Sequence, residues 1–270
     1  MSSIPQGPFV SPSCNNSHCH DGLPDSVSQS ILSSSRKCWR LMKAILFDLF
    51  GTLVPNLPLS TWEQSSAAVA SKLQIDTALY QELWNARFRD RMIGQILDGD
   101  HQFDCLLEEA GLEVSIEKRS GAARLHRELL REVLVPKPET CSTLDQILIA
   151  GLQLALVTDC SSAAPELLDE TPLGRYFPTR SISAFLGVRK PHPLMYTHCL
   201  ETLGLAAGEC IFVGDGNSEE LLGAKKCGLT TVWVDNGQHQ HWHDRFSPDG
   251  DYTIRSLDEL LPIIQTLCTE

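Results

Sequence analysis

The chain has 270 residues, of which 42% are apolar, and its formal charge is −12. No apolar run approaches the roughly 20 residues that span a bilayer, which argues against a membrane protein. The acidic charge disfavours a nucleic-acid partner but leaves small anionic substrates open, because a site can be locally positive. Ten cysteines without a CxxC pair indicate free thiols in a reducing compartment. We expect the cytoplasm, since no targeting signal is recognised.

Residues 1–41 differ from the rest of the chain. Eleven of them are serine and no hydrophobic periodicity is present, so we expect a disordered tail. A transit peptide and a misassigned start ahead of Met42 stay open as alternatives. The stretch from Cys14 to His20 contains residue types that bind metals, but a flexible segment does not favour a fixed site.

A folded pattern begins at Met42. We expect a short apolar strand over residues 44–47. Residues 57–136 are helical in pattern and contain no strand signal, with Asp76 and Ser115 as candidate N-terminal caps.

Beyond the stiff segment Val135–Pro138, strands and helices alternate. We expect strands over 154–157, 181–185, 211–213 and 230–234, and helices over 138–151, 161–169, 192–203, 218–227 and 256–267. This alternation predicts an α/β fold, a Rossmann-like and mostly parallel sheet with helices on both faces. The predicted domains are an α/β core of residues 42–56 and 137–270 and a helical cap of residues 57–136.

Polar side chains follow three of the predicted strands. They are Asp48, the pair Thr158-Asp159, and Asp215. Ligands of such sheets bind outside the carboxyl ends of the strands, so we expect a site there. Asp48 could attack an electrophile and form a covalent ester, or it could only cap the next turn. Mg²⁺ would relieve the repulsion between Asp48 and Asp215.

Glutamate, lysine and threonine side chains could complete such a site. Glu219 or Glu220 could reach the cation, or both could simply favour the start of a helix. Lys190 lies on a loop between a glycine and a proline. There it could neutralise a nucleophile and an incoming anion, or it could be a solvated surface lysine. Thr158 offers a hydroxyl and a backbone N–H to anion oxygens.

Four ordered motifs resemble those of the haloacid dehalogenase-like (HAD) hydrolase superfamily. They are DLFGT (48–52), the Thr of LVTDCS (156–161), the Lys of GVRKPHP (187–193) and VGDGNSEELLGAKKCG (213–228). The resemblance covers about residues 43–267, and the helical segment 57–136 stands where this superfamily inserts a cap. It implies that Asp48 is the nucleophile and that Thr158 and Lys190 hold the transferring group. It also implies an Mg²⁺ cofactor whose ligands would be Asp48, the backbone carbonyl of Phe50, Asp215 and Glu220.

Phe50 departs from the phosphatases of this superfamily, which usually carry a second Asp at this place as general acid and base. An aromatic residue here is similar to the 2-haloacid dehalogenases, and so is Tyr196. Those enzymes, however, need no metal and have a Ser/Asn-type loop where this chain has Asp215. The chain thus combines a dehalogenase-like first motif with a phosphohydrolase-like fourth motif.

The cap also differs from that of the dehalogenases. Their cap has an arginine just after a Leu-Trp pair, which grips the substrate carboxylate, whereas here Asn85 follows Leu83-Trp84. Arg87, Arg89 or Arg91 could substitute for it. The residues expected to contact the substrate are Gly51, Thr52, Asp159, Asn85 and Arg87.

These features favour Mg²⁺-dependent hydrolysis of a small phosphorylated metabolite through an aspartyl-phosphate at Asp48. A substrate with a good leaving group, such as an acyl phosphate, would need no acid at Phe50. A 2-haloacid dehalogenase and a non-catalytic ligand-binding protein stay open as alternatives. The expected partner is a small anionic molecule, not a nucleic acid or a membrane, and the sequence does not indicate the oligomeric state. The alternating His239, His241 and His243 suggest a surface loop more than a metal site.

Overall fold

The computed structural model describes residues 42–237 and 246–267. The predicted tail, with its Cys14 to His20 stretch, and the three histidines between 239 and 243 lie outside the described residues. Within the described part, no helix combines the length and the apolar character needed to cross a bilayer.

A single six-stranded parallel sheet forms the centre of the fold and confirms the predicted α/β class. The strands are β1 (Ala44–Phe47), β2 (Gln153–Thr158), β3 (Thr179–Ile182), β4 (Cys210–Gly214), β5 (Thr230–Val234) and β6 (Tyr252–Ile254). Their order across the sheet is β3-β2-β1-β4-β5-β6, and every pair is parallel. The order reverses at β1, which pairs with both β2 and β4, and this is the place where ligands bind in open α/β sheets.

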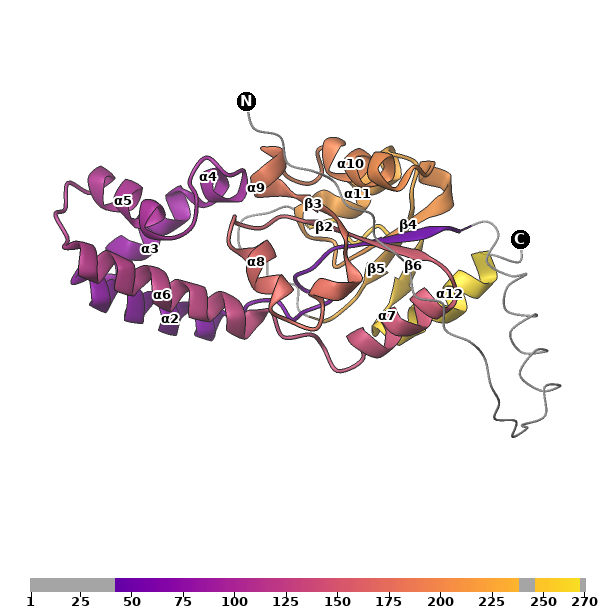
Figure 1. The fold of residues 1–270 in the computed structure, drawn as a ribbon, viewed down its shortest axis with the longest axis horizontal. Helices are drawn as coiled ribbons and strands as arrows, with labels where there is room; N and C mark the ends of the chain where they lie inside the picture. The colour runs from indigo at the N-terminus through magenta and orange to yellow at the C-terminus, as the bar shows by residue number, and fades with distance from the viewer. Residues whose placement is uncertain (1–41, 238–245, 268–270) are drawn as a thin grey trace, which may run out of the picture.

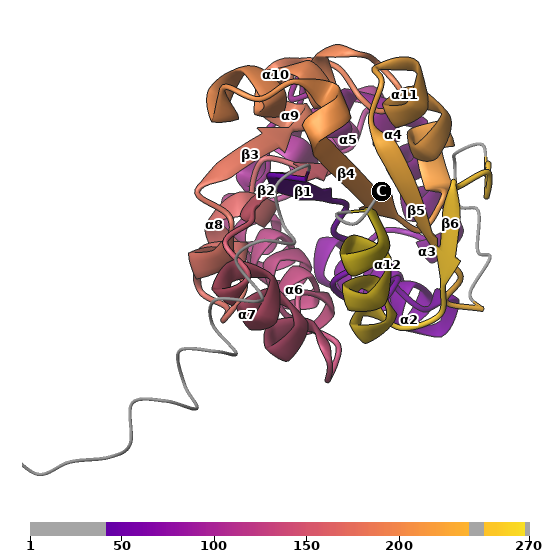
Figure 2. The ribbon, with the colours of Figure 1, turned by 90° about the vertical axis from the view of Figure 1, so that its right-hand side faces the viewer.

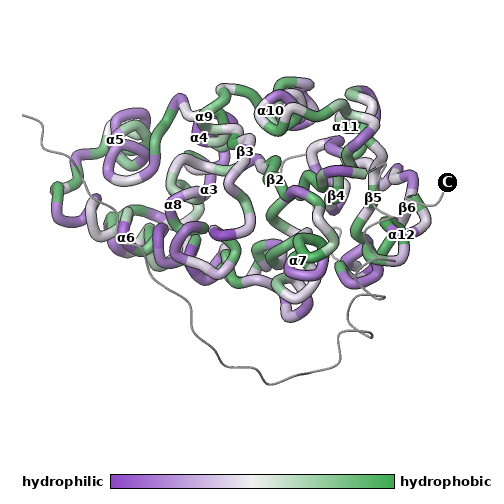
Figure 3. The backbone as a smooth tube through the Cα atoms, turned by 45° about the vertical axis from the view of Figure 1, so that its right-hand side comes forward, coloured by the Kyte–Doolittle hydropathy of each residue, from purple (hydrophilic) through white to green (hydrophobic). Residues whose placement is uncertain are grey.

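Helices cover both faces of this sheet (Figure 2). They are α7 (Thr140–Ile149), α8 (Ala164–Asp169), α9 (Ser183–Leu186), α10 (Leu194–Leu203), α11 (Glu220–Lys226) and α12 (Leu260–Leu267). Helices α7, α8 and α12 pack on one face and α10 and α11 on the other, which gives two separate apolar clusters. Because both faces are covered, all four residues of β1 are buried and apolar. Along α7, hydrophobic and hydrophilic stretches of the backbone alternate (Figure 3).

The segment between β1 and α7 forms a separate helical lobe, which we call the cap (Figure 1). Its helices are α2 (Leu59–Leu73), α3 (Thr77–Ala86), α4 (Phe88–Met92), α5 (Asp100–Glu109) and α6 (Ile116–Val133). The cap has its own apolar cluster, in which Trp84 and Phe103 are buried. Asp76 caps α3 as predicted, since its carboxylate accepts a hydrogen bond from the Leu79 N–H at 3.0 Å. The prediction for Ser115 is wrong in part, because it precedes α6 but its side chain makes no capping bond.

Several predicted boundaries differ from the structure, and one strand was not predicted. The strand expected over 181–185 ends at Ile182, because the buried Ser183 side chain donates to the Met92 carbonyl at 2.6 Å and the chain turns into α9. The helix expected from Ser218 begins at Glu220, since the two residues before it adopt left-handed backbone angles. Strand β6 was not predicted, because three residues are too few to show an alternating pattern.

Candidate active site

The carboxyl ends of the three central strands bring the predicted polar residues to one edge of the sheet. Asp48 follows β1, Thr158 ends β2 and Asp215 follows β4. Phe47 pairs with Val213 in the β1–β4 register, so the two aspartates leave neighbouring strands at nearly the same level. All three side chains are buried.

Lys190 lies between two of the carboxylates. Its Nζ donates to Asp48 Oδ1 at 2.5 Å and to Glu220 Oε2 at 2.6 Å. Burial alone would lower the pKa of Lys190, but the two carboxylates outweigh this effect and raise the pKa well above its ordinary value. Lys190 is therefore a permanent cation beside the candidate nucleophile, and not a solvated surface lysine.

The loop after Asp48 holds that carboxylate in place. Thr52 Oγ1 donates to Asp48 Oδ2 at 3.2 Å, so both oxygens of Asp48 accept hydrogen bonds. Gly51 has a φ of 81°, and a Cβ there would clash with the Asp215 carboxylate. Thr52 and Gly51 were expected to contact the substrate. In the structure Thr52 contacts Asp48 and Gly51 lies against Asp215.

Asp48, Asp215 and Glu220 form an acidic cluster. One carboxylate oxygen from each lies within 4.8 Å of the others. Burial and the nearby Asp48 carboxylate raise the pKa of Asp215 and that of Glu220. A hard divalent cation in this cluster would meet oxygen donors of the kind that Mg²⁺ prefers and would offset the repulsion. Among the described residues, none donates a hydrogen bond to the carbonyl oxygen of Phe50, which leaves that oxygen open to such an ion.

The second aspartate is oriented by amide side chains that sequence reasoning missed. Asp215 Oδ2 accepts from Asn56 Nδ2 at 3.1 Å and from Asn217 Nδ2 at 2.7 Å. Its Oδ1 accepts from the Asn217 backbone N–H at 3.0 Å. Asn217 lies in the quoted fourth motif, whereas nothing in the sequence around Asn56 indicated a contact across 159 residues.

Asp159, Thr158 and Tyr196 were also singled out from the sequence, and their hydrogen-bond partners differ. Asp159 Oδ1 accepts from the Lys190 backbone N–H at 3.0 Å, which fixes the loop that carries the lysine. The hydroxyl oxygen of Thr158 is buried and has no hydrogen-bond partner among the described residues. Tyr196 donates to the Glu220 carbonyl at 2.8 Å and is fully buried, so it supports α11 and does not face a substrate.

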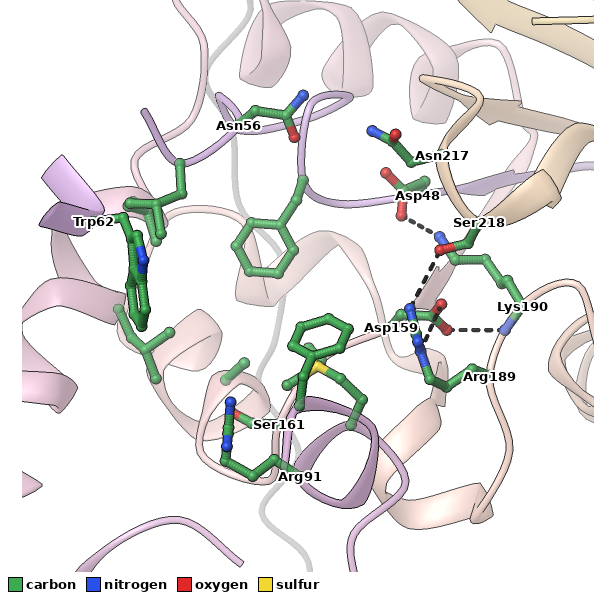
Figure 4. Close-up of a pocket in the computed structure, with 18 of the residues that line it drawn as sticks. Asp48, Asn56, Trp62, Arg91, Asp159, Ser161, Arg189, Lys190, Asn217 and Ser218 are labelled. Atoms are coloured by element: carbon green, nitrogen blue, oxygen red, sulfur yellow. Dashed lines mark hydrogen bonds and ion pairs between the residues drawn. The ribbon is translucent and has the colours of Figure 1, made fainter. Parts of the chain in front are cut away.

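A cavity of about 280 Å³ opens above these residues, between the core and the cap. Asp48, Lys190 and Asn217 lie on one side, and Trp62 and Arg91 lie on the opposite side (Figure 4). Phe50 lines the wall beside Asp48. The volume is near the lower end of the roughly 300–1,000 Å³ found for small-molecule sites, which suits a compact metabolite.

The cap residues expected to contact the substrate differ in position. Asn85 lines the cavity, whereas Arg87 does not: it forms ion pairs with Glu109 at 2.8 Å and Asp90 at 3.2 Å. Arg91, one of the arginines considered as substitutes, lines the cavity instead and is 3% exposed.

Comparison with known proteins gives a consistent result. A family model described as haloacid dehalogenase-like hydrolase matches residues 42–228. The chain is 26% identical over 233 residues to a glyceraldehyde 3-phosphate phosphatase of Methanopyrus kandleri, covering 85% of this chain and all of the relative. It is 29% identical to a phosphoglycolate phosphatase of Neisseria meningitidis, over 81% of this chain and 86% of that one.

Solved structures agree on the fold. A HAD phosphatase from Thermococcus onnurineus superposes with a TM-score of 0.58 and 28% identity, covering 83% of this chain and 98% of that chain. An L-2-haloacid dehalogenase from Xanthobacter autotrophicus has a TM-score of 0.55 at 18% identity, with 83% and 98% covered, which supports the fold alone. The match over most of the chain, together with the four motifs at one sheet edge, means that the chain belongs to the haloacid dehalogenase-like hydrolases.

Proposed function

We propose that this hydrolase is an Mg²⁺-dependent phosphatase of a small phosphorylated metabolite and that it works through an aspartyl-phosphate on Asp48. The observation that carries the proposal is the contact of Lys190 with Asp48 beside the carboxylates of Asp215 and Glu220. The relatives named as phosphatases support phosphate esters over halogenated acids.

In the first step, a carboxylate oxygen of Asp48 forms a bond to phosphorus and the bond from phosphorus to the leaving oxygen breaks. The electron pair goes to the leaving oxygen. Lys190 neutralises charge on the nucleophile and on the incoming phosphoryl oxygens. The buried Thr158 hydroxyl, which lacks a partner among the described residues, is available to donate to one of these oxygens.

In the second step, a water oxygen attacks phosphorus and the bond to Asp48 breaks. Both hydrogens of the water stay on the inorganic phosphate, and Asp48 is regenerated as a carboxylate. Asp48, Asp215 and the Phe50 carbonyl would hold Mg²⁺, with Glu220 in support. Bound there, Mg²⁺ would stabilise negative charge on the phosphoryl oxygens. Glu220 also accepts hydrogen bonds from Lys190 and the Gly216 N–H, so it orients the lysine in addition.

Phe50 can neither protonate the leaving group nor activate the water. The loss of a general acid or base costs about 10²–10⁴-fold in rate, so substrates with good leaving groups are favoured.

Phosphate release from a panel of esters and acyl phosphates tests the proposal, with Mg²⁺ and with EDTA. We expect release only with Mg²⁺, and none from Asp48→Asn. Halide release from 2-chloropropionate at the same rate with and without EDTA would instead identify a dehalogenase. Binding of Mg²⁺ and phosphate without turnover of any substrate would identify a ligand-binding protein.

A further inference from the structure

Away from Asp48 the cavity is lined mainly by apolar side chains, with Asn85, Arg91, His126 and Ser161 as polar exceptions. Four aromatic side chains line it, namely Phe50, Trp62, Trp84 and Phe88, and Leu129 and Leu130 add aliphatic surface. A leaving group with several hydroxyls would lose its hydration there and find few partners, which is costly. A flat ring would instead bury apolar area and stack against Phe50, Trp62 or Phe88, since Arg91 already covers the Trp84 ring.

Arg91 is an exception in this apolar wall. It is 3% exposed, and its guanidinium stacks on the Trp84 ring with 3.7 Å to the ring centroid. Among the described residues, no side chain or carbonyl forms an ion pair or hydrogen bond with this guanidinium. Burial lowers the pKa of Arg91 to about 10, so it keeps its charge at neutral pH. A buried cation without a hydrogen-bonded counter-ion is costly, and an anionic group of a ligand would remove that cost.

The groups around Arg91 leave it available to a ligand. Tyr80, Asp98 and Asp90 act on it only through space. Oδ2 of Asp98 accepts from Ser162 Oγ and from the Ala163 N–H, and its Oδ1 has no hydrogen-bond partner among the described residues. The neighbouring His126 is buried, and burial lowers its pKa to about 4, so it is neutral near pH 7 and does not compete for an anion.

Phe50 limits which leaving groups the site can expel. Without an acid at this position, the leaving oxygen must depart as an anion. A phenol has a pKa of about 10, whereas water, and by analogy an alcohol, has a value of about 15.7, so a phenolate is a far better leaving group.

From these three features we infer that the substrate, under the function proposed above, is a phosphate ester of a flat aromatic alcohol that carries its own carboxylate. The aromatic walls hold the ring, and Arg91 pairs with the carboxylate at the end of the cavity opposite Asp48 (Figure 4). Asp48 forms its bond to phosphorus, the bond between phosphorus and the aryl oxygen breaks, and the phenolate takes a proton from solvent after it departs.

The inference is tested with the full chain, Mg²⁺ and four esters. They are 4-carboxyphenyl phosphate, phenyl phosphate, 2-phosphoglycolate and glyceraldehyde 3-phosphate. We expect kcat/KM to be highest for 4-carboxyphenyl phosphate and lowest for the two alkyl esters. Arg91→Met should lower kcat/KM for the carboxylated aryl ester by about 10–100-fold more than for phenyl phosphate, as expected for one charge-assisted contact. Arg89→Met, on the exposed side of α4, is the matched control and should alter neither value.

A binding measurement separates this inference from the proposed function. Calorimetry with 4-hydroxybenzoate should detect binding to the native chain and at least tenfold weaker binding to Arg91→Met. If 4-hydroxybenzoate binds in this way but no ester releases phosphate, Arg91 forms an anion-binding pocket and the proposed phosphatase function is wrong. The inference is overturned if para-nitrophenyl phosphate is hydrolysed but alkyl esters react as fast as aryl ones, or if Arg91→Met affects both aryl esters equally.

Discussion

The core and the cap hold their functional residues in different ways. In the core, hydrogen bonds at the strand ends hold Asp48, Lys190 and Glu220, and each charge has an opposite charge within 2.6 Å. In the cap, packing between aromatic rings holds the side chains in place. The ring centroid of Trp84 lies 5.6 Å from that of Tyr80 and 5.9 Å from that of Phe103. Under the proposed function, the core would therefore react with a charged group, whereas the cap would select what is attached to that group.

The largest effect is expected from a substitution in the core that tests its proposed reactive role. Asp48→Asn removes the proposed nucleophile but keeps its size, so turnover should fall by about 10⁴-fold or more. Initial rates of phosphate release with Mg²⁺ measure it. Asp249→Asn, whose side chain is 74% exposed, is the control and should keep full activity. Turnover within tenfold of the native rate would rule out Asp48 as nucleophile.

Two buried cations allow a direct comparison of stability. Lys190→Met leaves the Asp48 and Glu220 carboxylates without their cation, so the free energy of unfolding should fall by about 3 kcal/mol. Arg91→Met removes a cation that has no counter-ion contact among the described residues, and the free energy should change by less than about 1 kcal/mol. Urea unfolding in EDTA measures both. Equal losses in the two variants would contradict this difference between core and cap.

The cap should respond to pH through His126. Burial lowers the pKa of its imidazole to about 4, against about 6.5 in the unfolded chain, so the unfolded state binds more protons between these values. The folded state is therefore fully stabilised above pH 6.5 and loses up to about 3 kcal/mol as the pH falls toward 4. Urea unfolding from pH 4.5 to 7 should show a flatter dependence in His126→Asn. Parallel curves for the two proteins would mean that His126 is not the group responsible.

The smallest expected effect concerns the junction of cap and core. Ser162 Oγ accepts from the Asp98 N–H at 2.9 Å and donates to Asp98 Oδ2 at 3.1 Å. Ser162→Ala should lower the free energy of unfolding by about 1 kcal/mol and raise KM more than it lowers kcat. Ser142→Ala, at an exposed position of α7, should change neither. A change in kcat alone would mean that the junction acts on the chemistry and not on the position of the cap.

Much of the core could be predicted from the sequence. Asp48, Thr158 and Asp215 each follow a short apolar strand, and parallel strands end at one edge, so local pattern and topology suffice to bring these residues together. The partners of Asp215 could not all be found in this way. Asn56 reaches it from a distant part of the chain through loop geometry, which leaves no periodic signal.

The cap shows what only the tertiary structure decides. Its helical character follows from sequence periodicity, but which residues face the cavity depends on how the helices join. Helix α3 ends at Ala86, and Arg87, with φ −100° and ψ 12°, separates it from α4. This break changes the helical phase, so Arg87 turns outward to Glu109 and Arg91 turns inward onto Trp84. The sequence by itself determined the family and placed the proposed reacting residues Asp48, Thr158 and Asp215 at strand ends. Packing between helices decided which arginine faces the cavity.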